Sequence, residues 1–273
     1  MLGINIHNIL IEHGNKTNHV SKMSATSTPD IVVEGRWTSW KDFTQDHTRF
    51  LVMLPGYLGA YIIPGFALSP VTIECVMNTM NTTCPGNTCP YCTGLHGQLL
   101  RLCGSGGGAD GTITISPPVA YAKAFCLARA TTSGGGGGGN NDVETAKEYA
   151  KLVDAIGTMK AYSVQALCWA LVWGQATGNS INAARDKLRA GAASDGSGAA
   201  AASFSLLDLF LLVWYGPLFA VIGVLNALLT VIPGSFPSLV STMLGALLWL
   251  PQALFIAPIG LASLVRHGGR LQK

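Results

Sequence analysis

The sequence has little charge for its length. Of its 273 residues, 11% are Asp, Glu, Lys or Arg, against roughly 25% in an ordinary globular protein. The 17 basic and 14 acidic residues leave a net charge of +3, which provides no strong field for a polyanion. The composition therefore excludes a charged, solvated coil and argues against nucleic acid as a partner.

Strand-like alternation of polar and apolar residues is almost absent outside 112–115, so the sequence predicts an all-α fold. Residues 1–28 have no uninterrupted apolar core of signal-peptide length. We expect them to form a disordered tail, and we expect the protein to be intracellular, in the cytoplasm or an organelle. The Gly-rich stretches 104–111 and 134–139 lack the preceding strand and following Lys-Ser/Thr of a phosphate-binding loop, and are predicted to be flexible insertions.

Apolar residues recur at helical spacing through residues 29–203, which we interpret as one helical domain. Helices are predicted from Lys41 to Leu54, from Pro70 through Met80, from Val119 to Arg129, from Asn141 through Ile156 and from Tyr162 to Gln175. An Ala/Gly/Ser linker at 191–203 closes this domain.

The last segment, 204–273, is the most hydrophobic. Asp208 is its only charge before Arg266. The stretches 204–232 and 236–265 each exceed the roughly 20 residues that cross a bilayer as a helix. Two interpretations stay open: apolar helices that complete the core or an oligomer interface, and a hairpin that contacts a membrane through 204–265, with basic residues flanking both ends.

Seven cysteines, an odd number, argue against a disulfide framework. The informative cluster is C-x-x-C-x-x-x-H, formed by Cys89, Cys92 and His96. If Thr88 caps a helix here, Cys89 lies at its N-terminus, where free amide groups and the helix dipole favour a thiolate. At about 100° per residue all three side chains share one face, so that the imidazole can accept a thiol proton and the two sulfurs can form a reversible disulfide.

Three kinds of site fit this cluster. A zinc site could use Cys84, Cys89, Cys92 and His96, but structural zinc sites usually combine two separated ligand pairs. A glutaredoxin-like site requires a strand before the motif and a βαβ context, and the preceding segment is predicted to be a helix. An all-helical thiol enzyme has neither difficulty.

With Glu74 upstream, the motif resembles that of the AhpD-like alkylhydroperoxidases of the carboxymuconolactone decarboxylase superfamily, over residues 40 to about 232. The resemblance implies an AhpD-like helical bundle that forms a homo-oligomer, commonly a trimer. It also implies that Cys92 attacks a hydroperoxide or a partner disulfide and that Cys89 resolves the product into a disulfide. His96 and a Glu would relay protons, and an external dithiol would supply electrons without a bound cofactor or metal.

The chain departs from the family pattern in two places. The family's Glu usually precedes the first cysteine by about 12 residues, whereas Glu74 precedes Cys89 by 15. The segment 83–87 reads as a short insertion that absorbs the difference. Tyr91 stands between the cysteines, where some members have His.

The sequence is also compatible with functions of other kinds. The alternative function is a membrane-associated structural or assembly subunit on the same scaffold, without turnover. Decarboxylation, the chemistry of the superfamily's other branch, is disfavoured because we expect that branch to lack the dithiol. Cys75, Cys103, Cys126 and Cys168 are predicted to be buried fillers, and His47 is predicted to lie on a solvated helix face.

Overall fold

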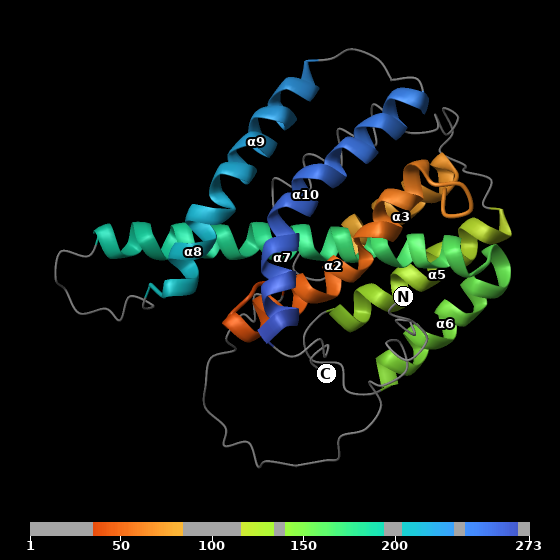
Figure 1. Ribbon diagram of the computed structural model, residues 1–273, viewed down its shortest axis with the longest axis horizontal. Coiled ribbons are helices and arrows are strands. Elements are labelled where there is room, and N and C mark those ends of the chain that lie inside the picture. Colours follow the sequence, from red (N-terminus) through yellow and green to blue (C-terminus); the bar gives the residue numbers. More distant parts are fainter. Residues whose placement is uncertain (1–34, 84–115, 134–139, 194–203, 232–237, 267–273) are drawn as a thin grey trace.

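The computed structural model describes residues 35–83, 116–133, 140–193, 204–231 and 238–266. Every regular element among these residues is an α-helix, which confirms the all-α prediction for this part of the chain. The helices are α2 (Trp40–Ile62), α3 (Pro70–Thr83), α5 (Pro117–Ser133), α6 (Asn140–Ile156), α7 (Thr158–Ala193), α8 (Leu206–Trp214), α9 (Gly216–Thr230) and α10 (Ser238–Arg266) (Figure 1).

The central element is α7, the longest helix at 36 residues. The predicted helix ends at Gln175, and polar and small residues follow it in the sequence. The helix continues because these residues find partners: the Thr177 hydroxyl donates to the Trp173 carbonyl at 2.7 Å, and Ser180 Oγ accepts from the Trp37 amide at 2.8 Å. Satisfied polar groups can be buried at little cost, so tertiary contacts extend the helix.

Helices from both ends of the chain pack around α7. On one side α2 crosses it and is covered in turn by α10; α3, α5 and α6 pack at one end, and α8 packs near the other (Figure 1). Fully buried side chains such as Phe50, Phe125, Leu167 and Leu211 belong to one continuous apolar core. The apolar C-terminal segment thus contributes to the same core as the helices before it.

The contact between α10 and α2 depends on a glycine. A Cβ atom placed on Gly260 would lie 3.0 Å from the His47 carbonyl oxygen and 3.0 Å from Leu51 Cβ. Real Cβ atoms rarely approach other atoms so closely, so the missing side chain allows the two backbones to meet.

The stretch predicted as one apolar span from 204 to 232 is broken at Tyr215. The resulting helices α8 and α9 are bent by 43° relative to each other. Among the described residues no single helix has the length and hydropathy of a membrane span, whereas this bent pair passes that test when it is taken together. Pro251 and Pro258 lie within α10.

Candidate functional site

The predicted site is only partly within the described residues. Cys89, Cys92 and His96 lie outside them, and so does Cys84. Glu74 is described: it lies on α3 and is half-buried.

Helix α3 holds Glu74 on a well-anchored element. Ser69 caps the helix, since its hydroxyl accepts from the Thr72 amide at 3.2 Å and contacts the Thr72 hydroxyl at 2.8 Å. Val76 and Met80 are fully buried and attach α3 to the core. The helix ends at Thr83, six residues before Cys89.

Cys75 is half-buried beside Glu74 on α3. Burial raises the pKa of its thiol, and the charge of Glu74 acts in the same direction. The Thr79 hydroxyl and the nearby Lys123 on α5 act in the opposite direction. The thiol form is therefore favoured, which makes Cys75 a poor nucleophile.

Cys126 on α5 and Cys168 on α7 form a buried pair with their sulfur atoms 3.4 Å apart. Their burial agrees with the prediction that they fill the core. The hydrogen bond with Cys168 and burial together raise the pKa of the Cys126 thiol well above its usual value. Among the described residues no group of three or more His, Cys, Asp or Glu side chains could hold a metal ion.

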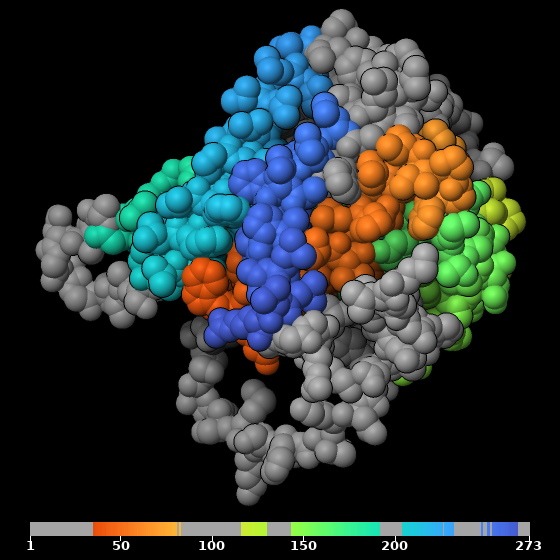
Figure 2. Space-filling model, viewed as in Figure 1, coloured from red at the N-terminus to blue at the C-terminus, as the bar shows by residue number. Residues whose placement is uncertain are grey.

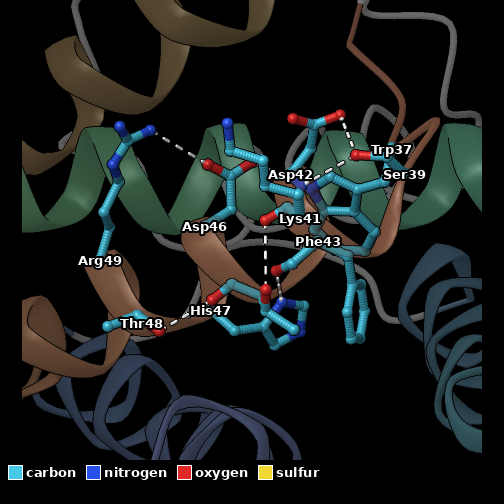
Figure 3. A network of polar contacts seen from close by, with 10 residues as sticks. Trp37, Ser39, Lys41, Asp42, Phe43, Asp46, His47, Thr48 and Arg49 are labelled. Atoms are coloured by element: carbon cyan, nitrogen blue, oxygen red, sulfur yellow. Dashed lines mark hydrogen bonds and ion pairs between the residues drawn. The ribbon is translucent and has the colours of Figure 1, made fainter. Parts of the chain in front are cut away.

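His47 contradicts its prediction, because it is fully buried and not on a solvated face. Its Nδ1 lies 2.6 Å from the Phe43 carbonyl oxygen, which can only accept, so Nδ1 carries the proton (Figure 3). Nε2 then accepts from the Tyr215 hydroxyl, and the Trp173 indole N–H approaches it at 3.4 Å. Burial lowers the pKa of His47 to about 3, although the bond to Phe43 acts to raise it.

A second polar group lies one residue earlier on α2. The Trp37 indole N–H donates to Asp46 Oδ2 at 2.9 Å, and Arg49 contacts Asp46 Oδ1 at 3.5 Å (Figure 3). Burial raises the pKa of Asp46, against the lowering effects of Trp37, Arg49 and Arg129. Arg129 also lies over the Trp169 ring, 4.4 Å from its centre, so this group joins α2, α5 and α7.

The sequence contains a signal that could have placed His47 correctly. Phe43 precedes His47 by four residues, and Phe50 and Leu54 follow it by three and seven residues. These spacings place all of them on one helix face. All three are buried, and His47 shares their face. The imidazole thus serves packing and hydrogen bonding within the core.

Comparison with protein-family models, with curated proteins and with solved structures gave no significant match to this chain.

Proposed function

We propose that the protein is a thiol-disulfide oxidoreductase that reduces hydroperoxides with the Cys89 and Cys92 dithiol. The observation that carries this proposal is the eight-residue pattern from Cys89 to His96, with a histidine four residues after the second cysteine. On a helix this spacing brings both thiols and the imidazole to one face. A dithiol can cycle between its reduced and disulfide forms, and an adjacent base can generate the reactive thiolate.

The three described cysteines are unsuited to attack a peroxide, which supports the assignment of this role to the Cys89 and Cys92 dithiol. Cys126 and Cys168 are buried against each other, and Cys75 is half-buried with a raised pKa. Peroxide reduction requires an accessible thiolate, so none of these three fits the role.

The proposed cycle balances atoms and electrons. The Cys92 thiolate attacks the distal oxygen of a hydroperoxide, which leaves a sulfenic acid on Cys92 and releases an alcohol. The Cys89 thiol then attacks the Cys92 sulfur, forms the disulfide and releases water. An external dithiol reduces this disulfide by exchange and becomes a disulfide itself. His96 accepts and returns the protons, and Glu74 is the proposed acid that positions or reprotonates it.

The family resemblance extends the proposal to a homo-oligomer, commonly a trimer, without a bound cofactor. Glu74 supports the proposed proton relay, because it is half-buried on a packed, capped helix that precedes the motif in the sequence. A carboxyl group held on a rigid element can serve a proton relay better than one on a loose chain.

The test is peroxide consumption by the reduced full-length protein, with hydrogen peroxide or cumene hydroperoxide as oxidant and dithiothreitol as the external dithiol. Cys92→Ser should reduce turnover to the uncatalysed rate. Cys89→Ser should form no disulfide within the motif and should turn over more slowly than wild type, because dithiothreitol must then reduce the Cys92 sulfenic acid directly. Cys75→Ser is the matched control and should keep the wild-type rate. If wild-type protein consumes no more peroxide than the buffer with dithiothreitol alone, the proposal is wrong.

A further inference from the structure

Helix α9 is exposed over most of its length. Phe219 is its last buried residue, and no described side chain from 220 to 231 is buried. Large apolar side chains are among the exposed ones: Val221, Val224, Leu228 and Val231 have 56%, 61%, 56% and 75% of their surface accessible. A soluble helix normally buries one apolar stripe and turns polar residues outward; α9 presents apolar side chains with no charged residue among them.

Helix α10 adds an apolar stripe on its outer side. Among the side chains described on this helix, the large exposed apolar ones are Leu247, Leu250, Leu254, Leu261 and Val265. At about 100° per residue these five positions fall within a sector of about 60°, and the stripe is about 27 Å long. Ile256, Gly260 and Ser263 lie on the opposite face and are buried, where α10 packs along α2. The stripe therefore points away from the body of the protein.

Helix α9 and the first part of α10 lie side by side at one end of the molecule, and α10 then continues across the helical body, as Figures 1 and 2 show. From residue 209 to residue 265 the sequence has no Asp, Glu, Lys, Arg or His. We call the exposed apolar side chains of α9 from Val221 onward and the α10 stripe the apolar face.

We infer that the apolar face docks into the hydrocarbon region of a lipid membrane. The inference is independent of the thiol chemistry proposed above. Beyond Phe219 the exposed residues of α9 extend over more than a single stripe, although Ile222 packs against the core, and a broad apolar surface of this kind suits lipid. A protein partner would cover one side and would usually meet a polar rim with Arg, Tyr or Trp anchors, whereas the large exposed side chains described on the apolar face are Val and Leu.

Positive charges at both borders of the apolar segment 209–265 agree with docking of the apolar face into a membrane. Arg266 ends α10 and is exposed. At the other border Lys187 pairs with Asp208, and Arg189 is exposed near the end of α7. Cations beside an apolar segment favour the interface with anionic lipid headgroups. The length of the α10 stripe, about 27 Å, is close to the thickness of a bilayer's hydrocarbon core of about 30 Å.

Flotation of the full-length protein with vesicles tests this inference. The vesicles are phosphatidylcholine with a minority of phosphatidylglycerol, and bound protein rises with them through a density gradient. The test variant is Val224→Glu with Leu228→Glu, because a buried carboxylate in hydrocarbon is costly. The matched control is Val143→Glu with Met159→Glu, which adds the same charge at exposed apolar positions of α6 and α7.

We expect wild type and control to float and the test variant to lose roughly tenfold or more of its bound fraction. Circular dichroism shows whether each variant keeps its helical content. Wild type remaining at the bottom of the gradient would overturn the inference, and so would a folded test variant that floats like the control. A lipid-free dimer that the test variant alone disrupts, together with no flotation, would identify a second copy of the chain as the occupant and would equally overturn it.

Discussion

The imidazole of His47 on α2 accepts a hydrogen bond at Nε2 from the hydroxyl of Tyr215, 168 residues later in the chain. Tyr215 stands between α8 and α9, where the apolar C-terminal segment bends. Both side chains are fully buried. This contact fixes the point from which α9 leaves the helical body.

Replacing Tyr215 with Phe should reveal the strength of this contact. Phe fills the same space but leaves Nε2 of His47 with only the long contact to Trp173. A buried acceptor without its donor costs about 1–3 kcal/mol of unfolding free energy. Urea denaturation measures this loss, and Tyr121→Phe, at an exposed position, should change the stability by less than about 0.5 kcal/mol. Equal effects of the two substitutions would contradict the assigned hydrogen bond.

The buried, neutral His47 should make the fold sensitive to mild acid. Its pKa is about 3 in the folded protein and 6.5 in the unfolded chain. Between these values the unfolded chain binds a proton that the folded protein does not. The unfolding free energy is therefore unaffected above about pH 6.5 and falls by up to about 1.4 kcal/mol per pH unit below it.

The measurement is urea denaturation of wild type and His47→Gln between pH 7 and pH 4. Glutamine does not titrate and can still accept from Tyr215, so the variant should be less stable at pH 7 but should lose less stability with acid. Parallel pH profiles for the two proteins would show that folding does not lower the pKa of His47.

The close approach of α10 to α2 predicts that Gly260 tolerates no larger side chain. Gly260→Val should lower the unfolding free energy by about 1–3 kcal/mol, because its side chain meets the His47 carbonyl and Leu51. Gly216→Ala is the control, since nothing lies within 4 Å of a Cβ added there. Thermal denaturation of both variants is sufficient, and a stable Gly260→Val protein would contradict the packing.

Asp208 should contribute to stability through its charge. Burial acts to raise the pKa of this carboxyl, but hydrogen bonds from Ser205 and Lys187 outweigh burial and lower it. The contribution is therefore present above the unfolded pKa of about 3.8 and is lost as the pH falls through the lower folded value. Asp208→Asn should cost about 1–3 kcal/mol at pH 7, and the difference from wild type should shrink below pH 4. A difference independent of pH would contradict the role of the charge.

Local sequence patterns predicted the helices well where local signals determine them. Ser69 and Pro70 start α3, and the periodicity through Ile156 defines α6. The continuation of α7 beyond Gln175 depends on contacts such as Trp37 with Ser180, which join residues 143 positions apart. Spacing within a short window contains no information about such partners.

The same limit applies only in part to His47, because the spacing of Phe43 and Phe50 already places it on the buried face of α2, whereas the partners of its imidazole are distant in the sequence. A histidine between Asp46 and Thr48 reads as polar, and only the approach of Tyr215 and Trp173 makes its burial acceptable. Of the candidate site, Glu74 was expected on a helix and lies on α3. The proximity of Cys126 to Cys168 could not be predicted, because it results from the packing of α5 on α7.

The most direct test of the proposed dithiol is to count and locate the thiols that peroxide removes. Reduced wild-type protein is treated with hydrogen peroxide, denatured, titrated for free thiols and mapped after trypsin cleavage. We predict that five of the seven thiols remain and that the tryptic peptide 50–101 loses two hydrogens without being linked to another peptide. Because this peptide contains Cys75 and Cys84 as well as Cys89 and Cys92, fragmentation in the mass spectrometer must then place the link between Cys89 and Cys92. Seven remaining thiols, or a cross-link between peptides 124–129 and 161–185 through Cys126 and Cys168, would contradict the account.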